Sequence, residues 1–172
     1  MSKVWFVTGA GSGIGAATVR AVLKAGDRVV ATGRHLDKGR NELSDDAGES
    51  LAFFQLDVTN AAQAKASVGE AIKAYGRIDV LDANNARYAA NSIEDYVAEG
   101  KAEAMWSGYH GTQQGDPARL GDVLVKIAGM DNPPKQFVAG SDAFAVVEPA
   151  LEARLGELRA YEQLSKSTDG SF

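Results

Sequence analysis

The chain has 172 residues, enough for one domain with a buried core. It has no cysteine, which excludes a disulfide scaffold, a thiol nucleophile and thiolate-bound zinc. The net charge of −5 excludes the basic footprint of nucleic-acid binding, and no apolar run approaches the length of a membrane span. The N-terminus leads directly into an apolar strand, so we expect no signal peptide and a cytoplasmic location.

A short apolar run at the start of the chain is followed at once by a glycine-rich loop. The run, residues 3–8, is typical of a parallel strand buried on both faces, and helical spacing begins after the loop. Glycines let a pyrophosphate reach the backbone N–H groups and the positive end of the helix dipole. The residues expected to contact such a pyrophosphate are Gly9, Gly11, Ser12, Gly13, Ile14 and Gly15. A glycine-rich turn without a ligand is the alternative.

The spacing of these glycines resembles a family signature. Thr8 precedes glycines at positions 9, 13 and 15, as in the Thr-Gly-x-x-x-Gly-x-Gly loop of the short-chain dehydrogenase/reductase family. Members of that family are oxidoreductases that bind a nicotinamide dinucleotide in a Rossmann-like fold. The resemblance therefore implies this fold and a dinucleotide cofactor for the present chain.

The second expected strand, residues 28–33, ends where the family selects its cofactor. An acid at this strand end accepts hydrogen bonds from the ribose 2′-OH of NAD, whereas an arginine pairs with the 2′-phosphate of NADP. Gly33 stands where the NAD-preferring members carry their acid, and Arg34 and His35 follow it. These two residues predict NADP as the cofactor. An exposed arginine that caps the strand is the alternative.

The third expected strand, residues 51–56, is closed by an Asp-Val pair. The resemblance implies that the Asp57 carboxylate accepts a hydrogen bond from the adenine amino group, and that the Val58 side chain lies on the adenine ring. Asp57 can also cap the helix that starts near Asn60, as can Thr59 or Asn60 itself. The two uses of Asp57 are compatible.

The fourth expected strand, residues 78–84, follows a helix over residues 61–75. In the family this strand runs into Asn-Asn-Ala-Gly and lines the cofactor cleft. Here the motif arrives about one residue late and ends in Arg87 instead of glycine. The resemblance implies that Asn84, Asn85 and Ala86 contact the cofactor ribose or tie strands together.

The residues that transfer hydride in the family have no counterpart in this sequence. A Tyr-x-x-x-Lys pair places both side chains on one helix face, where the lysine lowers the tyrosine pKa. Four residues after its five tyrosines, the sequence has Asp79, Ser92, Gly100, Gln113 and Ser165. The serine strand of the family is missing as well, so we expect no catalytic residue and a truncated central segment. His35 and His110 lack ligand-spaced partners, so no metal site is expected.

The second half of the chain, residues 91–172, resembles the C-terminal part of the family. A helix is expected near 117–130 and a last strand near 136–140. Pro149 is expected to split the helical stretch that follows, because proline breaks a helix interior.

The expected elements make an α/β fold, a Rossmann-like doubly wound parallel sheet in a three-layer α/β/α arrangement. Right-handed crossovers give five strands in the order 3-2-1-4-5. We predict one domain over residues 1–172, with the dinucleotide-binding half in 1–90 and a junction near 87–92. The last strand and the C-terminal helix are expected to pair with a second copy in a homodimer.

Two functions follow from these expectations. The first is the NADP(H)-binding domain of an oxidoreductase of the short-chain dehydrogenase/reductase type, without the serine and the Tyr-x-x-x-Lys pair. The second is a non-catalytic nucleotide-binding or structural protein built on a shortened Rossmann domain.

Overall fold

The computed structural model describes residues 2–46, 48–83 and 115–170. The chain divides into two compact units, Met1–Pro133 and Pro134–Phe172, and each is described by itself below. The junction expected near 87–92 lies outside the described residues. The organisation of residues 1–172 as one domain therefore stays a prediction.

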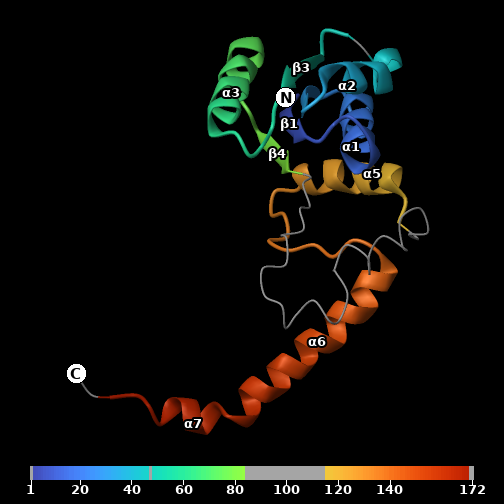
Figure 1. The fold of residues 1–172 in the computed structure, drawn as a ribbon. Helices are drawn as coiled ribbons and strands as arrows, with labels where there is room; N and C mark the ends of the chain where they lie inside the picture. The colour runs from blue at the N-terminus through green and yellow to red at the C-terminus, as the bar shows by residue number, and fades with distance from the viewer. Residues whose placement is uncertain (1, 47, 84–114, 171–172) are drawn as a thin grey trace, which may run out of the picture. The chain divides into compact units, whose positions relative to one another are not determined.

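The first unit is built on a four-stranded parallel sheet in the order β3-β2-β1-β4. Figure 1 labels β1, β3 and β4 of this sheet. Its strands are β1 (Val4–Thr8), β2 (Arg28–Gly33), β3 (Leu51–Gln55) and β4 (Val80–Ala83). Every residue of β1 is buried, as expected for a central strand with neighbours on both sides. The parallel, Rossmann-like sheet predicted from the sequence is confirmed.

The fifth strand predicted near 136–140 is not formed. These residues belong to no strand, and the Phe137 side chain within them is 52% exposed. An apolar stretch becomes a strand only where a neighbour accepts and donates its backbone hydrogen bonds, and the sequence pattern carries no information on that neighbour. The order 3-2-1-4-5 is therefore corrected to 3-2-1-4 for the described residues.

Helices cover both faces of the sheet. They are α1 (Gly13–Lys24), α2 (Leu36–Glu42), α3 (Ala61–Tyr75) and α5 (Pro117–Ala128), with a 3₁₀ turn at Ser44–Asp46. On one face, Trp5 and Val7 of β1 belong to a core that α1 and α5 cover. On the other face, Phe6 belongs to a core that α3 covers through Ala71. The alternation of side chains along β1 thus builds two cores and the expected three layers.

The contact between α1 and α5 depends on a glycine. A β-carbon on Gly121 would lie 2.9 Å from the carbonyl oxygen of Ala17 and 3.0 Å from the β-carbon of Ala21. Only a residue without a side chain lets the two helices approach this closely. Leu124 and Val125 of α5 then pack against the core on this face of the sheet.

Two carboxylates hold the amino end of β1. Asp27 accepts hydrogen bonds from the Lys3 amide at 2.8 Å and from the Trp5 indole at 3.1 Å. Asp79 accepts from the Val4 amide at 2.8 Å and from the Arg77 guanidinium at 2.8 Å. The hydrogen bond from Val4, and next the one from Arg77, hold the pKa of Asp79 below its ordinary value. The charged carboxylate therefore stabilises this end of the sheet.

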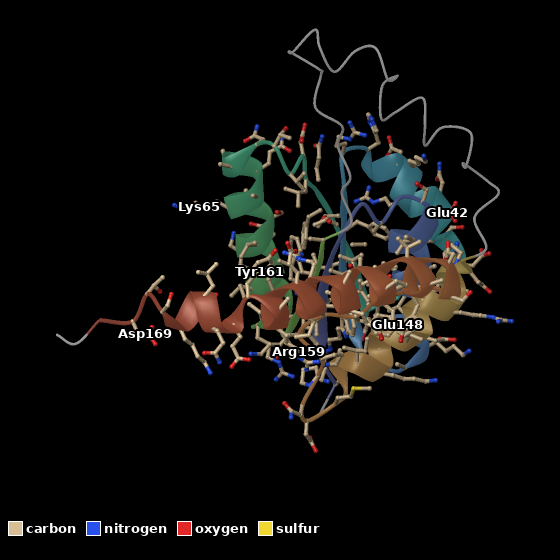
Figure 2. The ribbon with its side chains drawn as sticks, turned by 90° about the horizontal axis from the view of Figure 1, so that it is seen from below. Glu42, Lys65, Glu148, Arg159, Tyr161 and Asp169 are labelled. Carbon is tan, nitrogen blue, oxygen red and sulfur yellow. The ribbon has the colours of Figure 1, made fainter. Side chains whose placement is uncertain are left out.

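The second unit consists of α6 (Ser141–Ala160) and α7 (Glu162–Lys166). The helix α6 runs through Pro149, so the predicted split at this residue is wrong. Proline removes one backbone donor, and the strong helix formers around it keep the other hydrogen bonds of the helix. Figure 2 draws the side chains along α6, Glu148 and Arg159 among them, and no residue of this helix is buried.

Candidate dinucleotide-binding site

The glycine-rich loop joins β1 to α1 at the carboxyl end of the sheet. Gly9 and Gly13 have positive φ values of 65° and 57°, in the region that favours glycine. A β-carbon on Gly15 would lie 2.5 Å from the carbonyl oxygen of Gly9, so the loop folds back tightly on the start of α1. These three positions require glycine for the shape of the loop itself.

The start of α1 presents unpaired backbone donors. Ser12 is the N-cap residue, but its side chain makes no capping hydrogen bond. The first turn of α1 holds no acidic residue that would repel an anion. Ser12, Gly13 and Ile14 are exposed, whereas Gly15 is buried. The N–H groups of a first turn lack partners within the helix, so they are free to bind an anion here.

The loop lies directly against the end of β2. The Ala10 amide donates a hydrogen bond of 3.0 Å to the carbonyl oxygen of Thr32. A small hollow lies beside this bond. Its lining residues are Ala10, Gly11, Ala31, Thr32, Gly33, His35, Gly39 and Phe53. The structure thus brings Gly11 together with Gly33 and His35, from segments that are separate in the sequence.

Arg34 is exposed at the end of β2. Its carbonyl oxygen accepts a hydrogen bond of 3.2 Å from the Gln55 side chain, which ties β2 to the end of β3. Within the described residues, the Arg34 guanidinium itself makes no hydrogen bond or ion pair. His35 is the N-cap residue of α2, again without a capping side-chain bond. The cation at this strand end is therefore available to a ligand.

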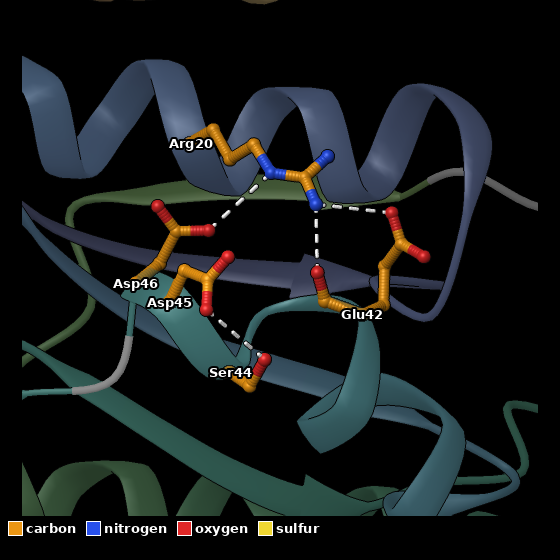
Figure 3. Close-up of polar contacts among 5 residues, drawn as sticks. All are labelled: Arg20, Glu42, Ser44, Asp45 and Asp46. Carbon is orange, nitrogen blue, oxygen red and sulfur yellow. Dashed lines mark hydrogen bonds and ion pairs between the residues drawn. The ribbon is translucent and has the colours of Figure 1, made fainter.

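An ion-pair cluster holds α2 against α1 (Figure 3). The Arg20 guanidinium of α1 pairs with the Glu42 carboxylate at 3.0 Å and with the Asp46 carboxylate at 3.3 Å. It also donates to the Glu42 carbonyl oxygen at 2.7 Å. The hydrogen bond with Glu42 raises the pKa of Arg20 above its ordinary value. Arg20 thus positions the helix that borders the hollow.

The third strand brings Asp57 and Val58 to the same carboxyl edge. Asp57 accepts hydrogen bonds from the Thr59 amide at 3.0 Å and the Thr59 hydroxyl at 2.7 Å. The cap of α3 is Asn60, whose side-chain oxygen accepts from the amides of residues 62 and 63. Of the capping alternatives, the structure thus selects Asn60. The Val58 side chain is 42% exposed, so its apolar surface is open to solvent.

The remaining predicted contacts lie outside the described residues. These are Asn84, Asn85 and Ala86, which follow β4 in the sequence. The last residue of β4, Ala83, is paired with Thr8 at the start of the glycine loop.

Residues of α2 and β3 that were not singled out from the sequence also border the site. Gly39 and Phe53 line the hollow, and a β-carbon on Gly39 would lie 3.5 Å from the Phe53 ring. In the sequence, the only signal for the close approach of α2 to Phe53 was a glycine, Gly39, within a short helix.

The described residues contain neither a membrane-spanning helix nor a metal-binding cluster. No helix there combines the length and the apolar character that crossing a membrane requires. No group of three or more histidine, aspartate or glutamate side chains in residues 2–46, 48–83 and 115–170 is arranged to hold a metal ion.

Comparison with known families identifies the chain. The family model described as short chain dehydrogenase matches residues 3–107. The chain belongs to the short-chain dehydrogenase family. The match begins before β1 and includes the glycine loop, the end of β2 and the Asp-Val pair.

Curated relatives match part of the chain. An oxidoreductase of Botryotinia fuckeliana is 35% identical over 111 residues, which are 61% of this chain and 40% of the relative. The 3-alpha-(or 20-beta)-hydroxysteroid dehydrogenase of Mycobacterium tuberculosis is 35% identical over 97 residues, 56% of this chain and 37% of that enzyme. The chain thus spans well under half the length of the curated relatives it matches.

One solved structure is similar over nearly the whole chain. A short-chain dehydrogenase from Streptomyces avermitilis superposes with a TM-score of 0.79, at 18% identity, over 98% of each chain. At this identity the similarity concerns the fold alone. The chain therefore has the Rossmann-like fold of short-chain dehydrogenases.

Proposed function

We propose that this chain is the NADP(H)-binding part of an oxidoreductase of the short-chain dehydrogenase/reductase type. The observation that carries the proposal is the exposed Arg34 guanidinium, which makes no hydrogen bond or ion pair among the described residues. A guanidinium pairs with a 2′-phosphate through its planar fork. The neighbouring Gly33 offers no carboxylate to the free ribose hydroxyl of NAD.

The surrounding residues fit the rest of the dinucleotide. The free N–H groups at the start of α1, with no acidic residue in that turn, suit a pyrophosphate. A side chain on Gly15 would collide with Gly9 and deform the loop that presents those groups. In this proposal Asp57 accepts from the adenine amino group and Val58 covers the ring. The proposed ribose contacts are Asn84, Asn85 and Ala86.

The cofactor, when bound, supplies or accepts the hydride in this class of reaction. None of the five tyrosines is followed four residues later by a lysine. We therefore propose that these 172 residues by themselves bind the cofactor without transferring hydride. The alternative is a non-catalytic nucleotide-binding or structural protein. If the purified chain catalysed sustained oxidation of NADPH by a carbonyl compound, the proposal that it transfers no hydride would be wrong.

Calorimetric titration with NADPH and NADH tests the proposal directly. We expect tighter binding of NADPH, and Arg34→Ala should weaken NADPH binding by about tenfold while leaving NADH unchanged, because it removes a charge-assisted pair to the phosphate. Arg159→Ala in α6 is a matched control, since it removes an exposed arginine from the other unit. Equal affinity for the two dinucleotides would contradict the choice of NADP.

The cytoplasmic location and the homodimer expected from the sequence stay predictions. A homodimer through the C-terminal helix would use its exposed apolar side chains. These include Phe144, Val146, Leu151, Leu155 and Leu158, all between 45% and 73% exposed. Sedimentation equilibrium of the purified chain distinguishes a monomer from a dimer.

A further inference from the structure

Lys38 of α2 lies beside the glycine loop. A β-carbon on Gly11 would be 3.9 Å from Cγ of Lys38 and 3.8 Å from the amide nitrogen of Gly39. The stem of the lysine therefore lies close to the loop at Gly11. The flexible end of the side chain beyond Cγ can turn over the loop, because lysine carries its ammonium on a long rotatable stem.

The same part of the loop borders the end of β2. Gly11 and Gly33 line one hollow, and the bond from the Ala10 amide to the Thr32 carbonyl holds the loop against the strand. Lys38 directly precedes Gly39, which lines this hollow, and Arg34 lies between Gly33 and His35, which line it as well. Two exposed cations are thus sequence neighbours of residues that line the same hollow.

Lys38 has no structural role that accounts for its charge. Its residue is exposed, and within the described part of the chain its ammonium makes no hydrogen bond or ion pair. In contrast, the exposed Arg20 nearby is paired with Glu42 and Asp46. A cation held beside a hollow without a protein partner is available to an anionic ligand.

We propose that Lys38 is a second cation for the 2′-phosphate of the cofactor and a determinant of NADPH over NADH. This inference rests on the proposed function of the site. The ammonium acts as a point charge at the loop, while the Arg34 guanidinium binds the phosphate with its planar fork.

The test is the titration of Lys38→Ala with NADPH, NADH, 2′-AMP and 5′-AMP. We expect affinity for NADPH and 2′-AMP to fall by about three- to tenfold, as for a partly exposed charge on a phosphate, with NADH and 5′-AMP unchanged. Lys38→Arg should restore most of the preference, because it keeps the charge. Lys24→Ala is the control, an exposed lysine at the last turn of α1.

The outcomes separate this inference from the proposed function. If Arg34→Ala removes the NADPH preference and Lys38→Ala leaves it intact, the role of Lys38 is overturned while the NADP site stands. An equal loss of NADPH and NADH affinity in Lys38→Ala would also overturn it, since that result indicates a disturbed loop. If the unmodified chain binds neither dinucleotide, the proposed function itself fails.

Discussion

The backbone of Gly15 lies so close to Gly9 that a β-carbon on Gly15 would stand 2.5 Å from the Gly9 carbonyl oxygen. The neighbouring atoms are backbone, which cannot rotate away as a side chain can. We therefore expect Gly15→Ala to lower the free energy of unfolding by about 1–3 kcal/mol, the usual cost of forced overpacking. Urea denaturation followed by circular dichroism measures this change. The same variant should lose nucleotide binding.

A matched substitution separates this clash from the general effect of replacing glycine. Gly69 lies inside α3, and a β-carbon there would meet nothing within 4 Å. Gly69→Ala should raise stability by about 0.5–1 kcal/mol, because alanine is the better helix former. Equal effects of the two variants would refute the close approach of Gly15 to Gly9.

The helix α5 should be displaced by a side chain at Gly121. Gly121→Leu places its β-carbon against the Ala17 carbonyl oxygen and the Ala21 side chain, so we expect a loss of about 1–3 kcal/mol. Hydrogen exchange should show faster exchange in α5 and along the adjoining face of α1. Gly156→Leu in α6, where nothing lies within 4 Å, is the control. Unchanged exchange in Gly121→Leu would contradict the contact.

Asp79 should make stability depend on pH in the acid range. Its folded pKa is lowered, first by the hydrogen bond from Val4 and then by the Arg77 guanidinium. The stabilisation is fully present above the unfolded carboxyl pKa of about 3.9 and is lost as the pH falls through the folded value. Asp79→Asn should therefore lower stability at neutral pH and flatten the acid dependence. The measurement is the free energy of unfolding of both proteins as the pH is lowered. If it fell equally in both, this role of Asp79 would be disproved.

The cap of α3 gives a further test. Asn60→Ala removes the acceptor for the amides of Ala62 and Gln63, so we expect a loss of about 1 kcal/mol. Asn60→Asp keeps an acceptor and should retain most of the stability. Thermal unfolding of the three proteins measures the difference. A loss in Asn60→Asp as large as in Asn60→Ala would argue against capping through this oxygen.

Much of the first half of the fold could be predicted from local patterns in the sequence. The apolar run of β1, the turn at Gly9 and the helix that ends at Gly76 were all predicted, because such signals depend on neighbouring residues in the chain. Gly76 ends α3 with a φ of 80°, a left-handed conformation that is common at the C-terminal end of a helix and that glycine adopts readily. The family and the parallel order of four strands follow from these patterns together.

Other features depend on contacts between distant residues, and the tertiary structure alone settles them. Residues 136–140 have strand composition but form no strand, and α6 continues through Pro149. Likewise, only the fold places Lys38 beside Gly11, since α2 and the glycine loop are distant in sequence. The local sequence records propensity and spacing. Two things arise only when the whole unit packs: the neighbour with which a strand forms its backbone hydrogen bonds, and the approach of α2 to the glycine loop.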